Sequence, residues 1–257
     1  MNIIAIIPAR MGSSRFPGKP MAELLGKPMI GHVYERVSEN RKLSKVVVAT
    51  CDKVIFDYIK NIGGTAIMTS KSHERASDRC AEALKTLEND GERFDIVVMV
   101  QGDEPMTRPE MISEAIEPMI NNEQIQVVNL FAEIKTEKEF KDRNCIKVVC
   151  DTNDDAVYFS REPIPSAWHG IESIPMKKQL GLIFFRRDYL LRFNALEQTP
   201  LEIIESVDMM RVLENGDKIK MVKVDDKSIG VDTPDDFLVA EKLLMNDAVF
   251  LKYRYRR

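Results

Sequence analysis

The sequence predicts an α/β protein with a mostly parallel central sheet and a small antiparallel extension. Short continuous apolar runs alternate with helix-like stretches up to about residue 100, a pattern typical of parallel strands covered by helices. Between about residues 125 and 190, strand-like runs follow one another with no regular helix between them. The chain has 257 residues, 44% of them hydrophobic, which suits a single domain over residues 1–257 with an antiparallel extension at about 125–190.

The first part of the chain alternates between strands and helices. Apolar runs typical of buried strands occupy residues 3–7, 46–50, 65–68 and 96–100. Helical patterns lie between them, at residues 29–39, 53–62 and 78–88. The Gly63-Gly64 pair is a stop signal for the second helix, and Ser77 is a suitable N-cap for the third. Because the strands are parallel, we expect the loops at their carboxyl ends to lie together and to carry the site.

The second part begins with the extension and returns to mixed structure. Strands are predicted at residues 127–133, 146–151, 156–159 and 181–185. A helix follows at 199–215, a strand at 218–224 and a closing helix at 233–245. The closing helix begins with Thr233-Pro234, a typical start signal. We interpret the basic segment from Lys252 to Arg257 as a frayed, solvated end.

Composition excludes several classes of protein. Lys and Arg number 37 against 41 Asp and Glu, a net charge of −4, which gives no general attraction for nucleic acid. No apolar run approaches ~20 residues, so we expect no membrane span. The first ten residues read as a strand rather than a signal peptide. Four cysteines without CxxC spacing and three scattered histidines argue against a zinc cluster and for the reducing cytoplasm.

The loop at residues 8–20, PARMGSSRFPGKP, has the composition of a phosphate-binding loop. It follows the first predicted strand and holds three cations and two flexible glycines, namely Arg10, Arg15, Lys19, Gly12 and Gly18. Backbone N–H groups and cations at such a place can bind a polyphosphate. It is not a Walker loop, because five residues separate its glycines and Pro20 follows Lys19. The dinucleotide fingerprint GxGxxG is absent from this loop as well.

Two acidic turns are candidates for a metal site. Asp103, after the strand that ends at Val100, is suited to hold Mg²⁺ against phosphate oxygens, with Glu104 as the alternative ligand or a helix cap. Asp232 precedes the last helix, and alone it would be interpreted as an N-cap. Paired across one cleft, Asp103 and Asp232 would form an all-oxygen site for a hard cation. With the basic loop they predict nucleotidyl transfer, in which catalysis is mostly positioning and charge neutralisation.

Together these segments resemble the 3-deoxy-manno-octulosonate (Kdo) cytidylyltransferase, or CMP-Kdo synthetase, family. The matching blocks are PARMGSSRFPGKPMAELLGKPMI from residue 8, VVVAT at 46–50, GDEPM at 102–106, KVV at 147–149, YFSR at 158–161, PLEIIES at 200–206, RVLENG at 211–216 and GVDTPDD at 230–236. The resemblance implies a GT-A-like nucleotide-binding sandwich, CTP and Mg²⁺ as co-substrate and cofactor, and a role in lipopolysaccharide biosynthesis. It also implies a homodimer built partly through the extension.

The resemblance assigns roles to matching positions of this chain. Arg10, Lys19, Asp103 and Asp232 would be catalytic, and the two aspartates would hold Mg²⁺. The residues that would bind CTP are Ala9, Arg10, Arg15, Lys19, Arg79 and Gln101. The implied reaction is attack of a sugar acid's hydroxyl on the α-phosphate of CTP, with release of pyrophosphate. Since the metal would lower the pKa of that hydroxyl, no histidine base is required.

The chain departs from the family pattern where the acceptor would bind. Gln179 stands where the family has His, and Ile183 where it has Tyr. Residues 75–79 read RASDR instead of SGTER, and residues 208–211 read DMMR instead of EQLR. The expected acceptor-binding residues are Arg75, Arg161, Gln179, Ile183, Glu202, Glu205 and Asp208, with Arg186 as a further anion contact. Such exchanges change specificity strongly, because a buried polar group left unpaired costs binding energy.

Several functions are compatible with these departures. The acceptor is expected to be Kdo or a modified, for example amino-substituted, Kdo. The alternatives are another small carboxylate or phosphonate acceptor, or a nucleotidyltransferase of another acceptor class with the same fold. A non-catalytic nucleotide-binding relative is the remaining alternative, and the presence of Lys19 and both aspartates favours an enzyme over it.

Overall fold

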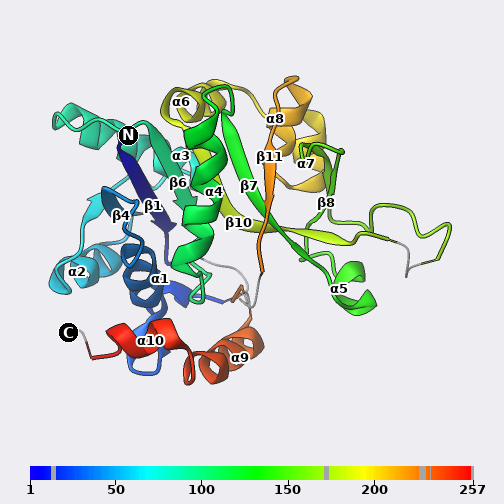
Figure 1. Cartoon of the computed structure of the whole chain (residues 1–257). Coiled ribbons are helices and arrows are strands. Elements are labelled where there is room, and N and C mark those ends of the chain that lie inside the picture. The colour runs from blue at the N-terminus through cyan, green and yellow to red at the C-terminus, as the bar shows by residue number, and fades with distance from the viewer. Residues whose placement is uncertain (13–15, 171–173, 226–229, 232, 256–257) are drawn as a thin grey trace. The chain divides into compact units, whose positions relative to one another are not determined.

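The computed structural model describes residues 1–12, 16–170, 174–225, 230–231 and 233–255 (Figure 1). The chain divides into two compact units. The first contains Met1–Ser113 and Lys227–Arg257, and the second contains Glu114–Asp226. The boundary falls within helix α4 (Pro109–Asn121). The range predicted as an extension, about residues 125–190, lies inside the second unit.

The first unit is built on a parallel sheet. Its strands are β1 (Ile3–Ala9), β4 (Lys45–Thr50), β5 (Ala66–Met68) and β6 (Ile96–Val100), in the order β6-β1-β4-β5. Ile6 of the buried β1 pairs with Val47 on one side and Met99 on the other. The continuous apolar runs therefore mark the strands correctly, because both faces of this sheet are covered. The carboxyl ends of the four strands meet at one edge.

Helices of the first unit follow its strands in the predicted order. They are α1 (Met29–Ser38), α2 (Lys53–Asn61) and α3 (Ala76–Asn89). Helices α1 and α2 pack against β4, and α3 packs against β1. Helix α3 begins earlier than predicted: Arg75, not Ser77, is its N-cap, and the Ser77 side chain is buried inside the first turn. A short 3-10 helix η1 (Lys19–Met21) and the hairpin of β2 (Glu23–Leu24) and β3 (Lys27–Pro28) connect β1 to α1.

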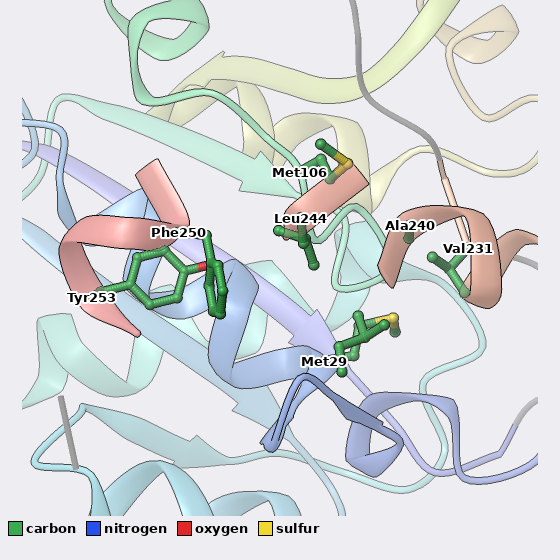
Figure 2. Close-up of a cluster of buried hydrophobic side chains, with 8 residues drawn as sticks. Met29, Met106, Val231, Ala240, Leu244, Phe250 and Tyr253 are labelled. Atoms are coloured by element: carbon green, nitrogen blue, oxygen red, sulfur yellow. The ribbon is translucent and has the colours of Figure 1, made fainter. Parts of the chain in front are cut away.

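The C-terminal helices α9 (Pro234–Leu244) and α10 (Ala248–Tyr253) complete the first unit. Thr233 starts α9 with a capping box, as its sequence predicts. The interpretation of the end as frayed is wrong at Tyr253, which is fully buried. Phe250 and Tyr253 lie one helical turn apart and join a cluster with Met29, Met106 and Val231 (Figure 2). The apolar face of α10, rather than the basic character of the segment from Lys252, decides where this helix lies.

The second unit contains the mixed and antiparallel strands. They are β7 (Val127–Glu133), β8 (Lys147–Cys150), β9 (Ala156–Ser160), β10 (Lys177–Arg186) and β11 (Lys220–Lys223). Strand β10 pairs antiparallel with β7 and with β8, and β8 with β9, while β11 lies parallel to β7. The predicted fold class, α/β with a mostly parallel sheet and a small antiparallel part, is confirmed. Strand β10 begins four residues before its predicted start.

Several helices differ from the sequence prediction. The single helix expected at 199–215 is two helices, α7 (Pro200–Glu205) and α8 (Met210–Glu214). Ser206 separates them in the left-handed region, with φ of 52°. Helices α4, α5 (Glu137–Lys141), α6 (Arg187–Ala195) and α10 were not predicted. Within the described residues, every helix is too short or too polar to cross a bilayer.

Candidate active site

A cavity of about 690 Å³ opens in the first unit, at the carboxyl ends of β1 and β6 and the start of α3. Six of the residues predicted to bind CTP or to act in catalysis line it, namely Ala9, Arg10, Lys19, Arg79, Gln101 and Asp103. Arg75, predicted for the acceptor, lines it too. The loops after neighbouring parallel strands thus converge as the sequence predicts. Arg15 and Asp232 lie outside the described residues.

The loop after β1 is closed at its base by hydrogen bonds. The backbone N of Gly18 donates to the Met11 carbonyl at 3.2 Å, and the Met11 N donates to Asp52 Oδ2 at 2.7 Å. Gly18 has a φ of +75°, a conformation that favours glycine. Phe16 packs edge-on against Phe237 of α9, with ring centroids 5.6 Å apart. This closure holds the exposed Arg10 at the cavity.

Lys19 and Asp103 form an ion pair at the cavity wall. Lys19 Nζ lies 2.8 Å from Asp103 Oδ2 and donates to the Val231 carbonyl at 2.6 Å. The Val231 N donates in turn to the Asp103 carbonyl at 2.9 Å. The Lys19 side chain is 10% exposed, whereas the Asp103 side chain is 36% exposed. The lysine is therefore held inside the wall, and the carboxylate stays open to the cavity.

The turn that carries Asp103 needs a glycine. A Cβ on Gly102 would lie 2.9 Å from the Pro8 carbonyl oxygen, closer than real Cβ atoms approach. The missing side chain lets the end of β6 pass close to the end of β1. This close approach places Asp103 beside the loop that carries Lys19.

The far side of the cavity is formed by the segment before α3. Arg79 is 3% exposed, and its Nη1 donates to Thr69 Oγ1 at 2.5 Å and to the Ser70 carbonyl at 3.2 Å. Its charge thus fixes the chain that leads to His73, which lines the cavity. His73 pairs with Glu82. Burial opposes ionisation of Glu82, but hydrogen bonds from the Ser70 backbone and His73 outweigh it and lower the pKa of Glu82.

Sequence reasoning missed several residues around this cavity. His73, Glu74 and Ala76 line it, and Asp52 closes the loop below it. The sequence prediction gives His73 no role in the site. The usable signal was its position, because residues 69–75 follow the carboxyl end of β5 on the same sheet edge as the other loops.

The donor set fits a magnesium ion that is held mainly by its substrate. Among the described residues, no group of three or more His, Cys, Asp or Glu side chains gathers for a metal. Magnesium commonly binds one or two carboxylates and takes its remaining ligands from water and substrate phosphates. The open carboxylate of Asp103, beside the cations of the loop, provides such a partial site.

The predicted acceptor residues in the second unit are engaged with one another and with the backbone. Glu205 accepts from Ser160 Oγ at 2.9 Å, from Tyr158 Oη at 3.2 Å and from the Arg161 N at 3.0 Å. The Arg161 guanidinium donates to the carbonyls of Glu205, Ser206 and Arg143. Arg186 donates to backbone carbonyls as well, those of Ile125, Met119 and Asn122. Both arginines hold the chain in this structure.

Four further members of that set lie in the interior or close to it. Glu202 is 3% exposed and forms a bidentate pair with Arg211, at 2.7 and 2.8 Å. Ile183 is 3% exposed within β10. Gln179 Nε2 donates to Asn129 Oδ1 at 2.6 Å, while Gln179 Oε1 is buried and has no hydrogen-bond partner among the described residues. Asp208 is half-buried before α8.

Comparison with known proteins places the chain in a family. Residues 4–219 match the family model described as cytidylyltransferase. A 3-deoxy-manno-octulosonate cytidylyltransferase of Trichlorobacter lovleyi is 44% identical over 252 residues, 94% of this chain and 98% of that protein. One of Syntrophus aciditrophicus is 42% identical and covers 96% of this chain and 99% of its own.

A solved structure agrees with these matches. The structure of CMP:2-keto-3-deoxy-manno-octonic acid synthetase complexed with CTP is 36% identical, with a TM-score of 0.89 over 95% of this chain and 99% of that one. A cytidylyltransferase from Leptospira borgpetersenii, 17% identical with a TM-score of 0.65, shares the fold. The chain therefore belongs to the cytidylyltransferase family and, within it, to the 3-deoxy-manno-octulosonate cytidylyltransferases.

Proposed function

We propose that this protein transfers CMP from CTP to the hydroxyl of a 3-deoxy-2-keto sugar acid, Kdo or a modified Kdo, and releases pyrophosphate. The observation that carries the proposal is the Lys19–Asp103 pair at the wall of a cavity lined by Arg10 and Arg79. Cations beside an open carboxylate suit a nucleoside triphosphate with its metal. The relatives are named for this activity, and one related structure holds CTP.

The residues of the first unit would bind and orient CTP. Arg10 and the N–H groups of the loop after β1 are placed to bind the phosphates, with Arg15 in support. Lys19 neutralises Asp103 and keeps it in place. The acceptor oxygen bonds to the α-phosphorus, the bond from that phosphorus to the β-phosphate oxygen breaks, and pyrophosphate leaves with the electron pair. The hydroxyl proton passes to solvent.

We propose Mg²⁺ as the cofactor, held by Asp103 and by Asp232, which follows the described Val231 in the chain. When bound, the ion would neutralise phosphate charge and lower the pKa of the acceptor hydroxyl. The hydrogen bonds of Val231 to Lys19 and to Asp103 support this assignment, because they bring the chain before Asp232 to the cavity wall.

Pyrophosphate release tests the proposed reaction. The protein is incubated with CTP, Mg²⁺ and Kdo, and we expect turnover that Asp103→Asn lowers by about a hundredfold or more, because a charge-stabilising group is lost. Asp57→Asn is the matched control, since Asp57 pairs only with the neighbouring Lys53 on the surface of α2 within the described residues. CTP binding without pyrophosphate release from any acid would instead identify a non-catalytic relative.

We propose an amino-substituted Kdo as the modified acceptor. Gln179 Oε1 is a buried acceptor without a partner among the described residues, and an ammonium or hydroxyl donor would satisfy it. We expect a lower KM for amino-substituted Kdo than for Kdo, and Gln179→His should reverse that order. The same preference in the wild type and in Gln179→His would contradict a role of Gln179 in acceptor selection. Turnover only with another carboxylate or phosphonate would identify that class of acid as the acceptor instead.

We propose that the protein is a homodimer formed through the second unit. We further propose that it acts in the cytoplasm and that its reaction is a step of lipopolysaccharide biosynthesis. Five large apolar side chains of this unit are exposed among the described residues, and they include Val157 at 56%, Ile203 at 61% and Ile204 at 74%. All four cysteines are free thiols, in keeping with a reducing compartment. Sedimentation of Ile204→Glu should shift from dimer to monomer, whereas Val54→Glu, at an exposed apolar position on α2, should leave the dimer intact.

A further inference from the structure

We propose that the buried ion pair of Arg36 and Asp247 positions the Lys19–Asp103 pair for nucleotide binding and transfer. Neither Arg36 nor Asp247 lines the cavity, so both are positioning residues rather than catalytic ones. The predicted effect on kcat/KM rests on the proposed function, because it requires turnover. The predicted effect on CTP affinity does not require turnover.

Arg36 fixes the turn that carries Asp103. Its side chain is fully buried in α1, its Nε donates to the Thr107 carbonyl at 2.8 Å, and its Nη2 donates to the Met106 carbonyl at 3.2 Å. Thr107 closes the same turn by donating its N and Oγ1 to the Glu104 carbonyl. A guanidinium has several donors in a rigid plane, so one side chain can hold both carbonyls.

Asp247 ties that arginine to the C-terminal helices. Its Oδ1 accepts from Arg36 Nη1 at 2.5 Å and from the Phe250 N at 2.7 Å, so it also caps α10. Burial opposes its ionisation, but the hydrogen bonds from Arg36 and the α10 backbone outweigh it and hold the pKa of Asp247 below its ordinary value. Asp247 therefore ties Arg36, which holds the Asp103 turn, to the start of α10.

The same C-terminal segment supplies the peptide that connects Lys19 with Asp103. Val231 precedes α9 and donates to the Asp103 carbonyl while accepting from Lys19. Its side chain is buried with Met106, Leu244, Phe250 and other members of the cluster in Figure 2. The Asp103 turn is thus held at two places, by Val231 near its start and by Arg36 at its end, and α9–α10 stabilise both contacts.

Breaking the ion pair should disturb the cavity wall more than it disturbs the fold. Asp247→Asn keeps a good N-cap for α10 but leaves the buried Arg36 without its counter-charge. A misplacement of about 1 Å in catalytic groups can cost on the order of a hundredfold in rate. We expect kcat/KM for CTP to fall on the order of tenfold to a hundredfold, with weaker binding of CTP in the absence of metal.

The experiment compares Asp247→Asn and Arg36→Lys with Phe250→Leu. Phe250 is in the same cluster but makes its hydrogen bond to Asp247 through its backbone, so trimming its ring lowers the melting temperature without removing the ion pair. Melting temperature, kcat, KM and the calorimetric Kd for CTP are measured well below the melting range. The proposal predicts that the ion-pair variants lose far more CTP affinity and kcat/KM than Phe250→Leu at comparable loss of melting temperature.

Two results would overturn the positioning role. One is wild-type kinetics and CTP affinity in Asp247→Asn; the other is a loss of both that matches Phe250→Leu at equal destabilisation. If Arg36→Lys does not fold, Asp247→Asn alone decides. If the wild-type protein turns over no acid, the proposed function fails, and the CTP Kd of the variants still decides the positioning role.

Discussion

Individual side chains in the first unit show how burial selects a protonation state. His32 is fully buried, with Nε2 2.8 Å from the Leu24 carbonyl and Nδ1 2.9 Å from Tyr253 Oη. Because a carbonyl can only accept, Nε2 carries the proton and Nδ1 accepts from the tyrosine. Burial lowers the pKa of His32 to about 4. The neutral imidazole is thus part of the contact between α1 and α10.

This contact makes stability depend on pH. Since the folded pKa of His32 lies below the unfolded value of 6.5, the unfolded chain binds more protons between these values. The free energy of unfolding should therefore be unaffected by this group above about pH 6.5 and fall by about 3 kcal/mol as the pH drops to about 4. Urea denaturation of wild type and His32→Gln across this range measures it. Parallel pH profiles for the two proteins would contradict the assignment.

Gly102 gives a second prediction at the scale of one residue. In Gly102→Ala the new Cβ would press on the Pro8 carbonyl oxygen, so the turn must move. We expect a loss of about 1–3 kcal/mol in the free energy of unfolding, together with reduced kcat/KM for CTP. Gly12→Ala is the stability control, because its Cβ would meet no described atom within 4 Å. Equal stability of both variants would show that the close approach is not needed.

At the scale of elements, α7 and α8 are joined by one buried ion pair. Glu202 caps the first turn of α7 and binds the Arg211 guanidinium with both carboxylate oxygens. Arg211 also donates to the carbonyls of Phe193 and Leu196, at the end of α6. The resemblance assigned Glu202 to the acceptor, whereas the structure uses both of its oxygens within the protein.

The variant Glu202→Gln distinguishes a structural role of Glu202, the ion pair with Arg211, from a role in binding the acceptor. Removing the charge leaves Arg211 buried and uncompensated, and we expect a loss of about 3–5 kcal/mol in the free energy of unfolding. Denaturant melts together with the KM for the acceptor measure both effects. Unchanged stability with a raised acceptor KM would establish the acceptor role instead. Glu214→Gln is a milder control, because the Glu214 side chain accepts from the backbone N of Leu201 and of Glu202 at the start of α7.

The elements also show what could be predicted from the sequence. Strands buried on both faces produce continuous apolar runs, so β1, β4 and β6 were correctly predicted. Helix α4 was missed, and it contains Pro118, which normally ends a helix. Helix α10 was missed because Lys252 and the arginines that follow the helix in the sequence obscure the aromatic residues Phe250 and Tyr253. Local residue type favours Ser77 as a cap, whereas the helix begins one residue before it, at Ala76.

The site residues, like the elements, could be predicted from the sequence only in part. The cavity residues could be predicted because each follows a strand whose carboxyl end faces the same edge. The role of Arg36 could not, since its partners Thr107 and Asp247 are 71 and 211 positions away in the sequence. Residue type alone also could not show that Arg161 and Arg186 donate to backbone carbonyls.

At the scale of the whole molecule, the chain separates its predicted tasks between two units. The described residues assigned to CTP gather in the first unit, and most of those assigned to the acceptor belong to the second. A ligand that binds only the folded state stabilises it by mass action. At a CTP concentration one hundred times its Kd, unfolding should cost about 2.7 kcal/mol more than without nucleotide. Thermal melts of the wild type and of Arg10→Ala, each with CTP and with GTP, measure this stabilisation. No shift of the wild-type melting temperature with CTP would contradict CTP binding.

A crystal structure of the protein with CTP and Mg²⁺ would show directly whether the cavity of the first unit binds the nucleotide. We expect electron density for the triphosphate in that cavity, with phosphate oxygens beside Arg10 and a metal ion on Asp103. Nucleotide bound elsewhere, or a metal ion with no contact to Asp103, would contradict it.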